Sequence, residues 1–200
     1  MSCGTIRVGI DEVGRGSMVG PVVACSVYFT EPQTDEEKEN RDYLLSNMKD
    51  SKKLSKKKLA QIYDVLTRSA FVHYKLASRS AKIIDHVNIL QATLQCFHDL
   101  AIHQDGYYHI IDGNIYPLSV PGEALIKADD SIHECMAASI IAKVVRDRLL
   151  QKMAKRYPSY QWDKNAGYGT ASHMENIDRF GYNKHHRMSF FRKREQRKNG

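Results

Sequence analysis

Acidic side chains stand at the ends of expected strands and helices, where they could act together. Asp11 and Glu12 follow a short apolar segment, Asp112 ends a second apolar segment, and Asp129 with Asp130 stands where a long helix is expected to begin. Sites in α/β proteins gather at strand ends and helix N-termini. We therefore expect these acids to converge although they are far apart in the sequence.

Such a group of acids indicates a particular chemistry. Carboxylates gathered without a cation would repel one another. Hard divalent ions such as Mg²⁺ remove the repulsion, because they prefer oxygen ligands and keep several waters. Two such ions roughly 4 Å apart serve phosphodiester hydrolysis, since one activates a water and the other stabilises the leaving oxygen. The pattern predicts metal-dependent phosphoryl chemistry on a nucleic acid.

Asp112 and Asp129 also admit a purely structural interpretation. Aspartate often ends strands and caps helices, so position alone leaves both interpretations open for these two residues. Asp11 and Glu12 are harder to explain in this way. Two adjacent acids between an apolar strand and a run of glycines have no structural role that we can name.

A glycine-rich connection, Gly14-Arg-Gly-Ser-Met-Val-Gly20, follows the first two acids. A dinucleotide-binding turn should open a helix, whereas here the last glycine falls one position late and Pro21 leads into an expected strand. The glycines would instead let the backbone lie close to a bound strand. Arg15 is placed to reach a phosphate or a sugar edge.

Strands and helices alternate along most of the chain. Apolar, β-branched or alternating segments predict strands at 6–11, 22–29, 70–77 and 107–112, with a further strand-to-helix passage near 124. Helical spacing predicts helices at 56–69 after an N-cap at Ser55, at 80–102, from a Ser131–Glu134 capping box to about 157, and at 172–180. Residues 31–48 are expected to form a loop with some helix.

This order of elements predicts an α/β fold with a mixed central β-sheet flanked by helices. A small C-terminal helical extension completes it. We place the catalytic domain at residues 1–157 and the helical, basic extension at residues 158–200.

The composition is that of one globular domain, with 200 residues and a formal net charge of +7. Residues 181–200 carry a net +6 and residues 49–58 a net +5, which leaves −4 on the remainder. Basic segments favour an anionic partner such as nucleic acid. Four separated cysteines argue against a zinc site or disulfides, and no signal peptide or membrane span is expected. We predict a monomeric protein of the cytoplasm.

Seven ordered segments resemble ribonuclease HII, the type 2 ribonuclease H. They are GIDEVGRGSMVGPVVA (9–24), DSKKL (50–54), IDHVNILQAT (84–93), IIDGN (110–114), KADDSIHECMAASIIAKVVRDR (127–148), NAGYGT (165–170) and HRMSF (186–190). Seven segments in order are far more specific than any one of them. The resemblance implies a ribonuclease H-like fold. It also implies an endonuclease that cuts the RNA strand of RNA/DNA hybrids and incises duplex DNA 5′ of an embedded ribonucleotide.

The resemblance also implies roles for individual residues. It implies that Asp11, Glu12, Asp112 and Asp129 are the catalytic and metal-binding acids, with Mg²⁺ or Mn²⁺ as cofactor. Gly14, Arg15 and Gly16 match the loop that senses the ribose 2′-hydroxyl, Tyr168 matches the tyrosine that packs against the sugar at the junction, and Lys52 and Lys53 lie in a segment placed beside the substrate. The implied partners are RNA/DNA hybrids and ribonucleotide-containing duplex DNA.

The chain departs from the family's pattern at a few positions. Ser17 stands where proline is common, and Ala166 stands where lysine is common. The sequence Lys127-Ala-Asp-Asp replaces the more usual Lys-Gly-Asp, so the fourth acid is Asp129 or Asp130, and register favours Asp129. Arg15, together with a signature that begins at residue 9, separates the chain from type 3 enzymes.

Two other classes of function stay open as alternatives. One is a non-catalytic nucleic-acid-binding protein, which a missing acid would favour. The other is a different nuclease of the same fold, such as an integrase or resolvase, because fold alone does not fix the substrate. The glycine loop and Tyr168 argue against the second.

Four residues near the C-terminus are expected to have supporting roles. We expect His173 and His186 to be structural or exposed polar residues rather than catalytic bases, because a two-metal mechanism supplies its own hydroxide. Arg187 and Ser189 are expected to brace the region of Tyr168. The small residues at 137–139 and 142 are expected to let the long helix approach the sheet.

Overall fold

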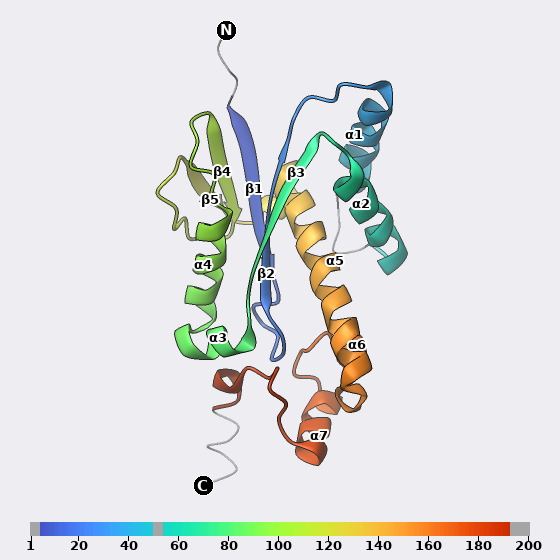
Figure 1. Cartoon of the computed structure of the whole chain (residues 1–200), viewed down its shortest axis with the longest axis vertical. Coiled ribbons are helices and arrows are strands. Elements are labelled where there is room, and N and C mark those ends of the chain that lie inside the picture. Colours follow the sequence, from blue (N-terminus) through green and yellow to red (C-terminus); the bar gives the residue numbers. More distant parts are fainter. Residues whose placement is uncertain (1–4, 50–53, 193–200) are drawn as a thin grey trace.

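A five-stranded mixed sheet forms the centre of the computed structural model, which describes residues 5–49 and 54–192 (Figure 1). Its strands are β1 (Ile6–Val13), β2 (Val22–Phe29), β3 (Val72–Arg79), β4 (Tyr107–Asp112) and β5 (Gly122–Leu125), in the order β3-β2-β1-β4-β5. β1 pairs antiparallel with β2 and parallel with β4, and β4 is parallel with β5. The predicted mixed sheet is confirmed. Because β1 and β4 are parallel, they end at the same edge.

Helices cover both faces of the sheet, because successive side chains of β2 point to opposite sides. Val23, Cys25 and Val27 pack with buried residues of α1 (Asp35–Asn47), α2 (Lys56–Arg68) and α5 (His133–Arg156). Val22 and Ala24 pack instead with α3 (Ala81–Val87) and α4 (Ile89–Leu100). Figure 1 shows α4 and α5 on opposite sides of the strands. Within the described part of the chain, no helix is long and apolar enough to cross a membrane.

Helix α5 lies directly on β1 at Gly9. A Cβ at this position would overlap the backbone of Glu134 and Cys135. The small residues Ala137 and Ala138 of the same helix are completely buried. The absence of a side chain at Gly9 therefore lets the helix backbone approach the strand, and this approach brings the polar residues of α5 to the acids that follow on β1.

Three local features differ from the prediction. Residues 31–48 contain the helix α1, which begins with a capping box between Thr34 and Glu37. The single helix expected at 80–102 is two helices, because Asn88 between them has a φ of 71° and its side chain caps α4. The predicted capping box at 131–134 is wrong, since α5 has Ile132 as its N-cap and follows the 3₁₀ turn η2 (Ala128–Asp130).

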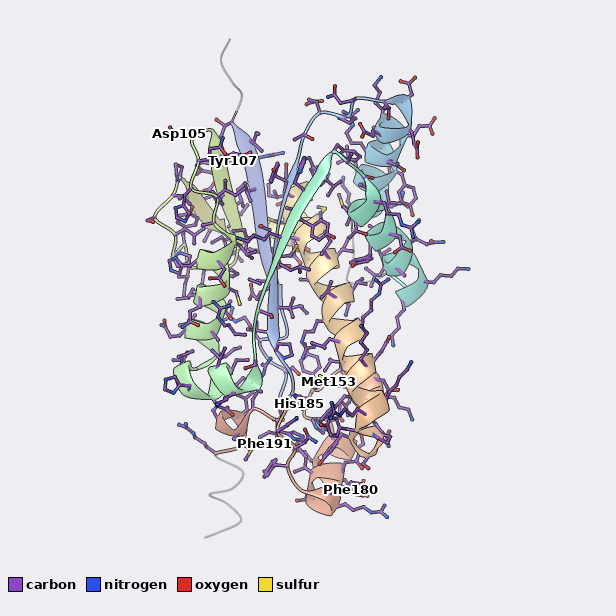
Figure 2. The ribbon with its side chains drawn as sticks, in the orientation of Figure 1. Asp105, Tyr107, Met153, Phe180, His185 and Phe191 are labelled. Atoms are coloured by element: carbon purple, nitrogen blue, oxygen red, sulfur yellow. The ribbon has the colours of Figure 1, made fainter. Side chains whose placement is uncertain are left out.

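The C-terminal extension packs on the last turns of α5. It consists of η3 (Pro158–Tyr160), α6 (Trp162–Asn165), α7 (Ala171–Phe180) and η4 (Met188–Phe191). Trp162 and Phe191 are buried in one cluster with Leu150 of α5 and Val19 of the glycine-rich loop. Figure 2 shows Met153, His185 and Phe191 where α5 meets the extension. The extension and the glycine-rich loop therefore share a core.

Two buried histidines, His173 and His186, link parts of this extension. Nδ1 of His173 donates to the carbonyl oxygen of Tyr168 at 2.8 Å, so its Nε2 is free of hydrogen and accepts from Nε1 of Trp162 at 3.2 Å. Nε2 of His186 lies 3.2 Å from the same atom of His173, and Nδ1 of His186 lies 2.7 Å from the backbone nitrogen of Asn183 and 3.1 Å from its carbonyl oxygen. Both rings are neutral in this arrangement. Burial lowers the pKa of both, and that of His186 falls to about 4.

Gly9→Ala should destabilise the fold by about 1–3 kcal/mol, because the added methyl group would force α5 away from β1. Urea unfolding followed by circular dichroism measures the change. Gly16→Ala is a matched control, since a Cβ there would lie 3.7 Å from Tyr168, an ordinary contact. The control should change stability by less than about 1 kcal/mol. Equal losses in the two variants would contradict direct packing of α5 on β1.

Stability should fall as the pH is lowered from neutral, because His186 has a pKa of about 4 in the folded protein, whereas an unfolded histidine has one near 6.5. The contribution of neutral His186 to the free energy of unfolding is complete above about pH 6.5 and is lost as the pH falls toward 4. Between pH 7 and pH 5 the loss should be about 2 kcal/mol. Urea unfolding at both pH values measures the loss. His186→Gln should lose less stability than the wild type, and His98→Gln, on the exposed surface of α4, should lose as much. If His186→Gln lost as much stability between the two pH values as the wild type does, the buried, neutral state of His186 would be contradicted.

Candidate active site

The predicted acids converge at one edge of the sheet. In the parallel β1–β4 pair, Ile10 lies opposite Ile111, so Asp11 and Asp112 are the next residues on adjacent strands. Asp129 lies in the turn η2, just before α5. One carboxylate oxygen from each of Asp11, Asp112 and Asp129 lies within 4.8 Å of the other two.

The three carboxylates line a pocket of about 460 Å³. Glu12, the next residue on β1, also lines this pocket but does not belong to the group of three. Asp11 and Asp129 are buried, with 5% and 7% of their surface exposed. Asp130 is exposed and does not line the pocket. The structure thus places Asp129, and not Asp130, beside the other acids.

Burial and mutual repulsion oppose ionisation in this pocket. The pKa of Asp11 is raised well above its usual value, first by burial and then by the charge of Glu12, while a hydrogen bond with Ser139 lowers it in part. Burial also raises the pKa of Glu12, and Arg15, with Nη1 at 3.2 Å from Glu12 Oε1, partly offsets this effect. A divalent cation would favour the ionised carboxylates. Since carboxylate oxygens are ligands that Mg²⁺ and Mn²⁺ prefer, these residues fit such a cation.

Asp112 has a second contact, which connects β4 to the turn η2. The backbone N–H of Ala128 donates to Oδ1 of Asp112 at 2.8 Å. Asp112 therefore lines the pocket and also holds the turn that carries Asp129. An amide oxygen could accept the same bond, so asparagine at this position removes a charge while the turn keeps its support.

The glycine-rich loop and Tyr168 lie side by side at the rim of the pocket. A Cβ on Gly16 would lie 3.7 Å from the ring of Tyr168. Oγ of Ser17 donates to the carbonyl oxygen of Gly167 at 3.0 Å, a bond that proline could not make. Tyr168 lines the pocket and is 45% exposed. The structure therefore brings the 14–16 loop and Tyr168 next to the acids.

One face of α5 contributes residues for which the sequence analysis predicted no chemistry. Ser139, Lys143 and Arg146 recur at helical spacing. Ser139 and Lys143 line the pocket, so a packing role is an incomplete description of Ser139. Arg146 is buried and donates to three carbonyl oxygens around the rim, those of Val19, Pro21 and Ala166. The spacing is visible in the sequence, but the face that meets β1 is known only once the docking at Gly9 is known.

The remaining predicted residues have different outcomes. Lys52 and Lys53 lie outside the described residues, so their contacts stay predictions. Arg187 donates to the carbonyl oxygens of Arg15 and Gly20, which places it against the glycine loop. Ser189 donates to Asp85 at 2.6 Å and so fastens the last described segment to α3.

The sequence matches a known family over most of its length. The profile of the family described as Ribonuclease HII matches residues 8–193. Ribonuclease HII of Rhodospirillum rubrum is 40% identical over 194 residues, which cover 94% of this chain and 85% of the relative. Ribonuclease HII of Ehrlichia canis is 38% identical over 188 residues, covering 92% of this chain and 85% of the relative.

Solved structures share the fold. A chain in the PCNA:RNase HII complex from Archaeoglobus fulgidus matches with a TM-score of 0.72 at 22% identity, over 92% of this chain and 94% of that one. Ribonuclease H2 from Pyrococcus horikoshii matches with a TM-score of 0.70 at 24% identity, over 92% and 93%. Bst-RNase HIII in complex with Mn²⁺ matches with a TM-score of 0.65 at 18% identity, over 90% and 64%. The fold is ribonuclease H-like, and by its profile and its relatives this chain belongs to the ribonuclease HII family.

Proposed function

We propose that this ribonuclease H endonuclease depends on divalent cations, cuts the RNA strand of RNA/DNA hybrids and incises duplex DNA on the 5′ side of an embedded ribonucleotide. The convergence of Asp11, Asp112 and Asp129 in a pocket beside Tyr168 carries the proposal. The acids would bind the cations needed for hydrolysis, and the glycine loop and Tyr168 at the rim would recognise the ribose. Membership in the ribonuclease HII family supports both parts.

Asp11, Glu12, Asp112 and Asp129 would hold Mg²⁺ or Mn²⁺. A bound divalent cation lowers the pKa of its water and stabilises the charge on the leaving oxygen. The protein fixes the carboxylates beforehand, because Asp112 is hydrogen-bonded to η2 and Asp11 to Ser139 of α5. The Mn²⁺ complex of Bst-RNase HIII, which shares the fold, supports the choice of ion.

Basic side chains beside the pocket are suited to the phosphates of the substrate. Lys143 lines the pocket and its side chain is 45% exposed, although it also pairs with Asp147 at 3.1 Å. Lys56, at the start of α2, lines an adjoining pocket together with Lys143. We assign phosphate contacts to these lysines as well as to Lys52 and Lys53, whose role follows from the family resemblance. Such contacts add affinity without selecting a sequence.

Recognition of the ribose is assigned to the glycine loop and Tyr168. The 2′-hydroxyl both donates and accepts hydrogen bonds and distinguishes RNA from DNA at a site. Gly14 has a φ of +91°, and Arg146 occupies the space that a Cβ would need, so the loop backbone can follow this path only with glycine. The backbone at Gly14 and Gly16 and the side chain of Arg15 face the hydroxyl in this proposal. The exposed ring of Tyr168 would pack against the sugar.

Asp112→Asn should lower cleavage by about 10³-fold or more, because it removes one charge from the cation site while keeping the bond from Ala128. The assay uses a labelled duplex with one embedded ribonucleotide, together with an RNA/DNA hybrid, an all-DNA duplex and an all-RNA duplex. Each is incubated with Mg²⁺, with Mn²⁺ and with EDTA. The wild type should cut only the first two and only with a cation.

Asp130→Asn is the matched control, since Asp130 is a neighbouring acid outside the group. It should cleave at close to the wild-type rate. Near wild-type cleavage by Asp112→Asn, or cleavage by the wild type in EDTA, would contradict the proposed cation site. Equal cutting of the all-DNA duplex would contradict the proposed ribose recognition.

A further inference from the structure

A short segment before η4 pairs with the backbone of the glycine-rich loop. Val19 and His186 form an isolated β-bridge. The N–H of Arg187 donates to the carbonyl oxygen of Met18 at 2.8 Å, and the N–H of Gly20 donates to that of His185 at 2.9 Å. The side chains of His186 and Arg187 are almost completely buried, with 2% and 0% exposed. Two adjacent, buried residues of the extension are thus paired with the glycine-rich loop at the rim of the candidate active site.

Arg187 supports the glycine loop. Its Nε donates to the carbonyl oxygen of Gly20 at 2.9 Å, and its Nη1 donates to that of Arg15 at 3.0 Å. These two oxygens belong to the two ends of the loop. The planar guanidinium can hold both at once, which an ammonium group cannot do in the same geometry. Arg187 therefore fixes the loop at both ends.

The guanidinium of Arg187 is buried and forms no ion pair within the described part of the chain, although the charge of Asp85 partly favours its ionised form. No carboxylate among residues 5–49 and 54–192 lies within ion-pair distance of it, and its Nη2 has no hydrogen-bond partner within that part of the chain. Burial, and then the charge of Arg146, lower the pKa of Arg187 to about 9. Burying a charge is costly unless the group is hydrogen-bonded, and the donors of this guanidinium go to the two ends of the glycine loop. The hydrogen bonds that offset the cost of burial are therefore the ones that position the loop.

His186 supports Tyr168, the residue that faces the glycine loop across the rim. Its Nε2 contacts Nε2 of His173 at 3.2 Å, and Nδ1 of His173 donates to the carbonyl oxygen of Tyr168 at 2.8 Å. This oxygen belongs to the same residue whose ring stands at the pocket. The two-ring chain therefore fixes the backbone of Tyr168 relative to the segment that carries Arg187.

We propose that His186 and Arg187 are positioning residues for ribonucleotide recognition. Arg187 holds the glycine loop, and His186 holds Tyr168 through His173. Because Arg187 and His186 are adjacent in the chain, they set the distance between the glycine loop and Tyr168. The inference rests on the proposed function, because it concerns recognition of the ribose by the glycine loop and Tyr168. Neither residue touches the substrate. Since a displacement of about 1 Å can cost 10²-fold in a positioned site, a loosened brace should weaken discrimination.

The experiment compares the affinity for a duplex that contains one ribonucleotide with the affinity for the same duplex in all-DNA form. It is done with the full chain carrying Asp112→Asn, in Mg²⁺, so that cleavage does not interfere. Arg187→Lys should reduce the ratio of the two affinities by about tenfold, because lysine cannot hold both loop oxygens. Affinity for the all-DNA duplex should stay within about twofold, since phosphate contacts are untouched.

Arg79→Lys is the matched control. Arg79 is a partly buried arginine of β3 that bonds Gln95 and Asp99 of α4, away from the pocket. It should keep the wild-type ratio even if its loss lowers stability. Thermal unfolding of each variant shows that binding is measured on folded protein. A merely structural role for Arg187 would change stability without changing the ratio.

His186→Gln tests the contact from His186 through His173 to Tyr168. It also replaces Arg187→Lys as the test if that variant does not fold. Its ratio should also fall, toward that of Tyr168→Ala. An unchanged ratio in folded Arg187→Lys or His186→Gln would overturn the inference. Failure of the proposed function has a different signature, because the parent protein itself would then show no preference for the ribonucleotide.

Discussion

The mutual repulsion of buried carboxylates is the constraint on which the rest of the structure depends. Asp11, Asp112 and Asp129 place oxygens within 4.8 Å of one another, and burial, followed by the charges of Glu12 and Asp112, raises the pKa of Asp11. An arrangement of this kind is unfavourable unless a cation neutralises it. The fold must therefore hold the acids together against their repulsion before a cation binds. The parallel β1–β4 pair and the bond from Ala128 to Asp112 do this.

Helix α5 connects this constraint to recognition. Its close approach at Gly9 places Ser139 beside Asp11 and Lys143 at the pocket. Two turns beyond Ser139, Arg146 donates to the backbone carbonyl oxygens of Val19 and Ala166, on both sides of the rim. The extension then packs on the last turns of the same helix. One helix thus holds the acids and the residues proposed to recognise the ribose in fixed relative positions.

Much of this arrangement could be predicted from the sequence. Acids at strand ends predicted the group at the sheet edge, because short apolar segments mark the strands and sites in α/β proteins gather at strand ends. The parallel β1–β4 pairing and its register, which set Asp11 beside Asp112, are known only from the structure. The helix α1 was predicted only as a loop with some helix, since it is polar almost throughout and only its Thr34–Glu37 capping box marks it. The break at Asn88 depends on one residue with positive φ, which no periodicity reveals.

The supporting residues could not be predicted in the same way. Arg146 and Arg187 bind carbonyl oxygens of residues far away in the chain, and such contacts leave no local pattern. The tautomers of His173 and His186 depend on partners that only the folded extension brings together. Glu12 adjoins Asp11 in sequence and lines the same pocket, yet its carboxylate, which pairs with Arg15, lies outside the group of three.

The central claim is that Asp11, Glu12, Asp112 and Asp129 bind a divalent cation, and thermal unfolding in the presence of Mn²⁺ tests it most directly. A ligand at 100 times its Kd stabilises the folded state by about 2.7 kcal/mol, whether or not any substrate is present. We predict that Mn²⁺ raises the Tm of the wild type and of Asp130→Asn, relative to EDTA, and leaves that of Asp112→Asn nearly unchanged. An equal rise in all three proteins, or no rise in the wild type, would contradict the account.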